Sequence, residues 1–150
     1  MDICQQIRSL LPYAEPFLFV DQYEHLDENE AQGTFTFRPD AFYYAGHFPG
    51  NPVTPGVILI EVLAQIGVVG LGLYLTYGDE ATQGASFAFT SAEVDFLKPV
   101  KPGEKVWVRA EKVYFRLGKL KCKVVMTNAQ KETVCQGYLS GIMIKADRYA

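Results

Sequence analysis

One long apolar segment constrains how this chain can fold. From Val57 to Tyr77 the only charged residue is Glu61, and the segment is close to the length of a membrane-spanning helix. Gln65 follows Glu61 by four residues, which puts both side chains on one face of a helix. Three glycines interrupt the apolar run: Gly67, Gly70 and Gly72. We therefore predict the helix of a soluble protein, buried on nearly all sides, rather than a membrane span.

The segments around this helix predict strands and turns. In chain order we expect a short amphipathic helix at 2–10, an apolar strand beginning at 17–20, a polar hairpin connection at 27–30, a strand at 33–38, a loop at 39–55, the long helix from just after Pro55 to near Gly78, an exposed connection at 79–84, and strands at 85–97, 105–117, 119–128 and 133–145. Only a sheet that curls around the helix can bury a helix with so many apolar faces. We predict one α+β domain over residues 1–150, a curved antiparallel sheet wrapped around one long central helix. A second subunit is the natural cover for its exposed edges.

Composition excludes several classes of function. A net charge of −3 and a pI near 5.4 provide no basic footprint, so we expect no nucleic-acid partner. The three cysteines are scattered, which predicts free thiols in a reducing cytosol. Two histidines without ligand spacing provide little for a zinc site, and His25 is expected at the surface. The first residues lack the pattern of a secretory signal. We expect a cytoplasmic protein without metal or cofactor.

A histidine, a helix start and a carboxyl group follow one another closely in this chain. His47 lies in a loop rich in proline and glycine, and histidine side chains exchange protons at neutral pH. Gly56 stands where the helix begins, so its N–H has no partner within the helix and favours developing negative charge. Glu61 projects from an apolar helix, which should raise its pKa. A base, an oxyanion site and an acid are what elimination β to a thioester carbonyl requires.

The run from His47 to Val57, His-Phe-Pro-Gly-Asn-Pro-Val-Thr-Pro-Gly-Val, followed by Glu61-Val-Leu-Ala-Gln65, resembles the signature of the bacterial 3-hydroxyacyl-[acyl carrier protein] dehydratases. Other matches lie on both sides of this run, from about residue 10 to about residue 105: Leu11-Pro12, Pro16-Phe17-Leu18-Phe19-Val20-Asp21, Phe96, Val100 and Pro102-Gly103-Glu104. The later strands are consistent in pattern only.

The resemblance implies a hot-dog fold, in which a sheet wraps around one helix, and dimers that often assemble into hexamers. It implies dehydration of a (3R)-3-hydroxyacyl-[acyl carrier protein] to the trans-2-enoyl thioester, in fatty acid or related polyene or polyketide biosynthesis. His47 would act as the base, and Glu61 would come from the neighbouring subunit. The backbone N–H of Gly56 would polarise the thioester carbonyl. Glutamate at position 61 resembles the general dehydratase branch, whereas the dehydratase–isomerase branch carries aspartate there.

Two segments depart from the family pattern. Tyr13-Ala14 stands where the family usually has a His-Arg pair, and the helix end at 73–80 is also atypical. A specialised paralogue would explain both. An acyl-thioesterase or an enoyl-CoA hydratase of the same fold is an alternative, although those families place their acids differently. A non-catalytic partner subunit of a dehydratase is the other alternative, which the Tyr13-Ala14 departure leaves open.

Two secondary expectations concern the acyl chain and the carrier protein. Four apolar side chains are candidates for lining a substrate tunnel: Phe48, Val57, Phe87 and Phe89. Ordinary core packing is the competing explanation for such residues. The later strands are basic although the chain is acidic, and acyl carrier proteins are strongly acidic, so part of this surface is expected to steer docking. Solvated strand faces also explain such cations. They are Lys98, Lys101, Lys105, Arg109, Lys112, Arg116, Lys119, Lys121 and Lys123.

Overall fold

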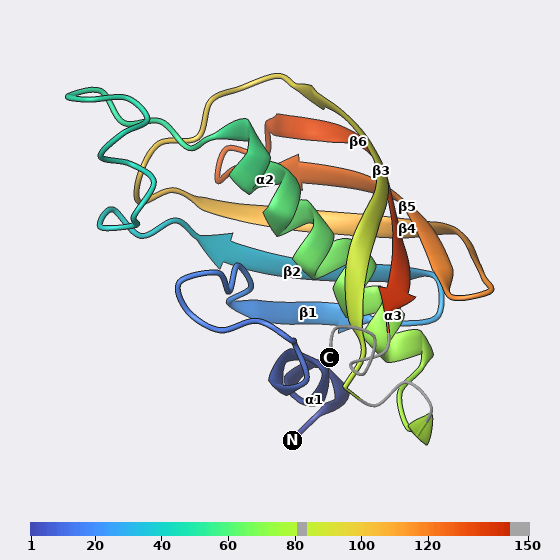
Figure 1. The fold of residues 1–150 in the computed structure, drawn as a ribbon. Coiled ribbons are helices and arrows are strands. Elements are labelled where there is room, and N and C mark those ends of the chain that lie inside the picture. The colour runs from blue at the N-terminus through green and yellow to red at the C-terminus, as the bar shows by residue number, and fades with distance from the viewer. Residues whose placement is uncertain (81–83, 145–150) are drawn as a thin grey trace.

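A six-stranded antiparallel sheet curls around one long helix in this protein (Figure 1). The structure is a computed structural model that describes residues 1–80 and 84–144. The elements are α1 (Ile3–Ser9), β1 (Gln22–Leu26), β2 (Glu30–Thr36), the central helix, β3 (Ser86–Phe96), β4 (Lys105–Arg116), β5 (Lys119–Thr127) and β6 (Thr133–Ile144). The predicted order of elements is confirmed. Positions 81–83 of the predicted connection and position 145 of the last predicted strand lie outside the described residues.

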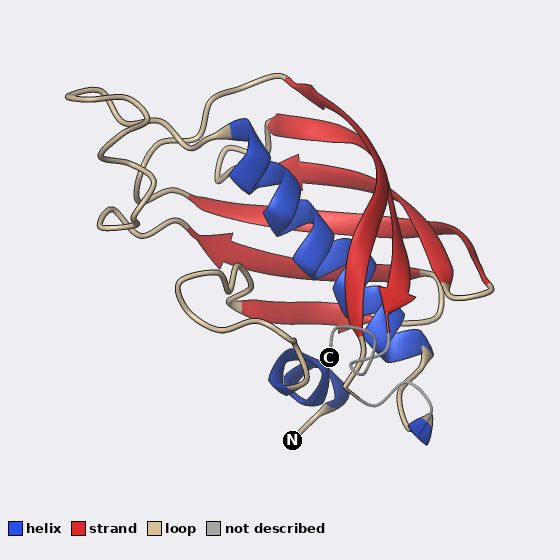
Figure 2. Ribbon diagram, viewed as in Figure 1, coloured by secondary structure: helices blue, strands red, loops and turns tan. Residues whose placement is uncertain are grey.

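The strands follow the spatial order β1-β2-β4-β5-β6-β3. β3 comes directly after the central helix in the chain but pairs with β6, so β1 and β3 form the two edges of the sheet. Figure 2 shows β3 crossing the helix on the side away from β2, which gives the sheet its curl. Tight turns join the later strands, and Gly103 and Gly118 have φ of 89° and 77° there, which favours glycine.

The central helix has three consecutive parts: α2 (Gly56–Leu63), a π-helical segment η1 (Ala64–Val69) and α3 (Gly70–Leu75). Gly56–Leu75 has a mean hydropathy of 2.2 and is by length and composition apolar enough to cross a membrane, but 78% of its most apolar stretch is buried inside the fold. The predicted buried helix is therefore confirmed. The π-helical segment was not predicted.

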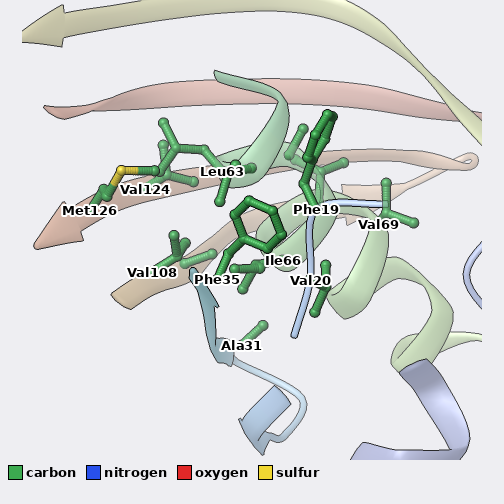
Figure 3. Close-up of a cluster of buried hydrophobic side chains, with 14 of the residues drawn as sticks. Phe19, Val20, Ala31, Phe35, Leu63, Ile66, Val69, Val108, Val124 and Met126 are labelled. Carbon is green, nitrogen blue, oxygen red and sulfur yellow. The ribbon is translucent and has the colours of Figure 1, made fainter. Parts of the chain in front are cut away.

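Apolar side chains from the helix and the strands meet between the two layers (Figure 3). Leu63 and Ile66 of the helix are fully buried, and Val124 and Met126 of β5 are their counterparts on the sheet. The helix glycines let neighbours approach its backbone closely. A methyl group on Gly67 would lie 2.9 Å from Cβ of Ala110. Close contact between helix and sheet therefore depends on positions without a side chain.

The predicted start of the first strand at 17–20 is wrong, because β1 begins only at Gln22. The backbone of this segment bonds to a side chain instead of a neighbouring strand. The N–H of Phe19 donates to Oε1 of Gln65 over 2.8 Å, and Nε2 of Gln65 donates to the carbonyl of Phe17 over 3.1 Å. The apolar residues are still used, since Phe19 and Val20 are buried in the core.

Candidate active site

His47 lies in the long connection between β2 and α2, which extends beyond the end of the sheet in Figure 1. The loop is closed around this residue, since the N–H of Val53 donates to the carbonyl of His47 over 2.9 Å. Nδ1 of His47 lies 2.9 Å from the carbonyl oxygen of Val53. A carbonyl oxygen can only accept, so Nδ1 carries the proton and Nε2 is left with its lone pair free. Phe48 stacks on the imidazole at 4.2 Å between ring centroids.

The end of this loop is fixed before the helix begins. The hydroxyl groups of Tyr44 and Thr54 are 2.6 Å apart, and the N–H of Thr54 donates to the carbonyl of Val100 over 2.8 Å. Gly56 then opens α2 with an N–H that has no partner within the helix. A methyl group on Gly56 would lie 3.1 Å from the Phe96 ring. The absence of a side chain therefore leaves room for the ring beside the helix start.

Glu61 is partly buried on α2, and Gln65 holds its carboxylate. Nε2 of Gln65, a fully buried residue, donates to Oε2 of Glu61 over 2.9 Å. Burial raises the pKa of Glu61, and the bond from Gln65 opposes that rise. The predicted rise in the pKa of this carboxyl group is therefore present in the structure. A carboxyl group that keeps its proton to a higher pH is suited to donate it.

A small cavity of about 40 Å³ opens beside Glu61. It lies between the helix and the edge strand β3, and its walls are Tyr13, Glu61, Ala64, Val68, Val69, Phe87, Ala88, Phe89 and Gly141. Phe87 and Phe89, two of the predicted tunnel residues, thus lie near the carboxyl group. The other two do not line this cavity: Phe48 stacks on His47 with 53% of its surface exposed, and Val57 is 72% exposed.

The structure does not bring His47 and Glu61 of one chain together. Within residues 1–80 and 84–144 no hydrogen bond joins the two side chains, and His47 does not line the cavity beside Glu61. His47 and Gly56 lie at the two ends of one short stretch of loop, whereas Glu61 lines the small cavity beside β3. One chain therefore supplies all three predicted groups, with the histidine and the carboxyl group in separate surroundings.

The family assignment follows from comparison with known proteins. The model of the FabA-like domain matches residues 11–139. The 3-hydroxyacyl-[acyl-carrier-protein] dehydratase FabZ of Acetivibrio thermocellus is 34% identical over 147 residues, covering 97% of both chains. The FabZ of Acinetobacter baylyi is 38% identical over 120 residues, covering 79% of this chain and 78% of its own. The chain belongs to this dehydratase family. The predicted family membership is confirmed.

Solved structures show the fold of this dehydratase family member independently. The dehydratase heterocomplex ApeI:P from Xenorhabdus doucetiae matches with a TM-score of 0.79 at 11% identity, covering 99% of this chain and 96% of its own. A hypothetical thioesterase with coenzyme A from Streptococcus pneumoniae matches with a TM-score of 0.60 at 15% identity, covering 82% and 84%. At such identities these structures show the hot-dog fold and nothing finer. The predicted fold is confirmed.

His25 lies at the surface, as predicted, but it belongs to a group of possible metal ligands that the sequence did not indicate. His25, Asp27 and Glu30 offer ligand atoms within 4.8 Å of one another. Nε2 of His25 lies 2.8 Å from Oδ2 of Asp27, and Arg109 binds Glu30 over 2.9 Å. These contacts, one to His25 and one to Glu30, hold the group together on an exposed hairpin.

Several of the predicted docking cations have partners on the sheet. Lys105 lies over Trp107, Arg116 over Tyr114 and Lys121 over Tyr138, at 4.5–5.3 Å from the ring centroids. Lys98 pairs with Glu132 over 2.9 Å. Carrier docking on this surface stays a prediction.

Sequence reasoning missed the roles of Gln65 and Tyr13. In the sequence, Gln65 shares a helix face with Glu61 and closes the signature run, and this spacing of four residues is the signal that could have indicated a bond between them. In the sequence, Tyr13 stands out as a departure from the family pattern. No local pattern indicates that it lines the cavity of Glu61, because the two residues are far apart in the chain.

Proposed function

We propose that this protein dehydrates a 3-hydroxyacyl thioester carried by an acyl carrier protein and releases the trans-2-enoyl thioester. The observation that carries the proposal is the pair of unlike groups: a histidine with Nε2 free and a carboxyl group with a raised pKa. Such a pair provides a base and an acid at one pH. The relatives named 3-hydroxyacyl-[acyl-carrier-protein] dehydratase supply the substrate class.

In the proposed reaction, Nε2 of His47 removes a proton from C2 of the acyl chain. The electron pair moves toward the thioester carbonyl, whose oxygen is stabilised by the N–H of Gly56 at the helix start. The carboxyl group of Glu61 protonates the 3-hydroxyl group, which leaves as water while the double bond forms between C2 and C3. Transfer of the proton from His47 back to Glu61 restores both groups.

We propose that His47 and Glu61 of one site come from different subunits of a homodimer, or of a trimer of dimers. β3 is an edge strand with one paired side, and apolar side chains around the loop and the helix start are exposed. They include Phe42, Phe48, Val57, Phe89, Phe96 and Leu97. A second copy would cover both the edge and these side chains. We further propose that residues 1–150 act as one domain in the cytoplasm.

The direct test offers 3-hydroxyacyl-[acyl carrier protein] substrates of several chain lengths and follows 2-enoyl formation by mass spectrometry. We expect turnover by the wild-type protein and a loss of about 10²-fold or more in His47→Ala. Glu28→Gln, in the exposed connection between β1 and β2, is the control and should keep full activity. Lack of enoyl product at every chain length, or full activity in His47→Ala, would overturn the proposal. Release of free carrier thiol instead would favour the thioesterase alternative.

Subunit mixing tests the shared site. His47→Ala and Glu61→Gln subunits are each expected to be inactive, but a mixed dimer contains one site with both groups intact. Random exchange of equal amounts should restore about a quarter of the wild-type sites. Subunits carrying different affinity tags show whether exchange has occurred. Proven exchange without recovered activity would contradict a site built from two chains.

A further inference from the structure

Tyr13 and Glu61 line the same small cavity between the helix and β3. At about 40 Å³ the cavity is large enough for a water-sized group. Apart from Tyr13 and Glu61, its walls are aliphatic side chains, glycine and the rings of Phe87 and Phe89. A hydroxyl group that enters this space therefore meets a carboxyl group and a phenol among apolar neighbours.

The Tyr13 segment is held by the same side chain that holds Glu61. Gln65 donates to Oε2 of Glu61 and to the carbonyl of Phe17, and it accepts from the N–H of Phe19. Tyr13 contacts Phe17 at 6.3 Å between ring centroids, and Phe17 contacts Phe19 at 4.8 Å. Position 13 is thus tied to the helix that carries Glu61, and a phenol there is preorganised.

The hydroxyl group of Tyr13 is free to bind a ligand. Among the residues that the structure describes, no hydrogen bond to the Tyr13 hydroxyl is formed, although the side chain is partly buried. Burial raises the pKa of Tyr13, and the negative charge of Glu61 raises it further. The phenol therefore keeps its proton at neutral pH and can donate it in a hydrogen bond.

We infer that Tyr13 is a further catalytic residue, whose hydroxyl group donates a hydrogen bond to the 3-hydroxyl oxygen of the acyl chain beside Glu61. The inference rests on the proposed dehydration. The phenol would orient the leaving oxygen toward the carboxyl group that protonates it and would stay bonded to the water that forms. No bond to Tyr13 itself is made or broken, and its proton stays on the phenol.

A binding cycle tests this contact without turnover. The two probes are S-(3-hydroxybutyl)pantetheine and S-butylpantetheine, thioethers that lack the carbonyl needed for elimination. Each is titrated by calorimetry into the full-length wild-type protein and into Tyr13→Phe. The 3-hydroxyl group should strengthen binding to the wild-type protein about fivefold, the value of one ordinary hydrogen bond. In Tyr13→Phe the gain should fall to about twofold or less. An equal gain in both proteins, or no binding of either probe to the wild-type protein, would overturn the inference.

Turnover separates this inference from the proposed function. With 3-hydroxyacyl-[acyl carrier protein], Tyr13→Phe should lower kcat about tenfold, whereas Tyr74→Phe should leave kcat unchanged. Tyr74 is a partly buried phenol on α3 outside the cavity walls. A wild-type protein without dehydratase activity defeats the proposed function and with it the catalytic role of Tyr13, and the binding cycle then still decides whether Tyr13 binds the 3-hydroxyl group. Unchanged kcat in a folded Tyr13→Phe protein defeats Tyr13 alone.

Discussion

Gln65 donates a hydrogen bond to Glu61 over 2.9 Å from the next turn of the central helix, and the same amide group binds the backbone of the N-terminal segment. All the bonding groups of this side chain are used in a fully buried position. The amide thus links the fold of the N-terminal segment to the orientation of the carboxyl group. A loss of this link should affect stability as well as activity.

Gln65→Ala is expected to lower the free energy of unfolding by about 2–4 kcal/mol, because it leaves the N–H of Phe19 and the carbonyl of Phe17 without partners. Urea denaturation followed by circular dichroism measures the change. Gln136→Ala, on the exposed face of β6, should stay within about 0.5 kcal/mol of the wild type. Equal stability of the two variants would show that the bonds of Gln65 contribute little.

The raised pKa of Glu61 predicts a specific pH dependence of stability. A carboxyl group whose pKa is higher in the folded state binds more protons there, so stability falls as pH rises above the ordinary value of 4.5 and levels off above the folded pKa. Glu61→Gln removes this effect. The stability of Glu61→Gln relative to the wild type should therefore increase from pH 4 toward neutral pH, as measured by urea denaturation. A difference that does not change with pH would contradict the shift.

The two histidines should carry their protons on opposite ring nitrogens. His47 faces a carbonyl oxygen with Nδ1, whereas His25 faces the carboxylate of Asp27 with Nε2. Both partners only accept, so neutral His47 should be protonated at Nδ1 and His25 at Nε2. Ring ¹⁵N chemical shifts distinguish the two tautomers, and His25→Gln assigns the signals. A neutral His47 protonated at Nε2 would remove its role as the proposed base.

Gly70→Ala is expected to destabilise the protein, because a methyl group there would collide with the buried ring of Tyr23. Overpacking of this kind costs about 1–3 kcal/mol, which exceeds the gain of about 1 kcal/mol from replacing glycine with alanine in a helix. Gly46→Ala is the matched control, since nothing lies within 4 Å of the added methyl group. Thermal unfolding compares the two. A Gly70→Ala protein as stable as the wild type would mean that Tyr23 can move aside without cost.

The helix and the strands after it could be predicted because their patterns are local. The apolar run around Glu61 and the alternation along β4 each indicate one kind of element within a dozen residues. The segment at Phe17 has an equally apolar pattern, but its hydrogen-bond partner is Gln65, more than forty positions away in the chain. Local periodicity cannot reveal such a partner.

The same limit applies to the candidate site. His47, Gly56 and Glu61 could be predicted from the residue types and their spacing in one continuous stretch. The placement of Tyr13 beside Glu61 depends on how the N-terminal segment crosses the helix. The π-helical segment is also invisible in the sequence, since an apolar stretch such as Ala64–Val69 fits an α-helix equally well.

The π-helical segment directly after Glu61 has a consequence for how the central helix can change length. A π turn holds one residue more than an α turn, so deleting one residue within 64–69 can restore an α-helical turn and keep the flanking helices in phase. The same deletion within α2 would rotate everything beyond it by about 100°. The extra residue of the π turn lies between Glu61 and the glycines of α3. A deletion there could therefore shorten the helix while the face that carries Glu61 and the glycine face of α3 keep their present orientation.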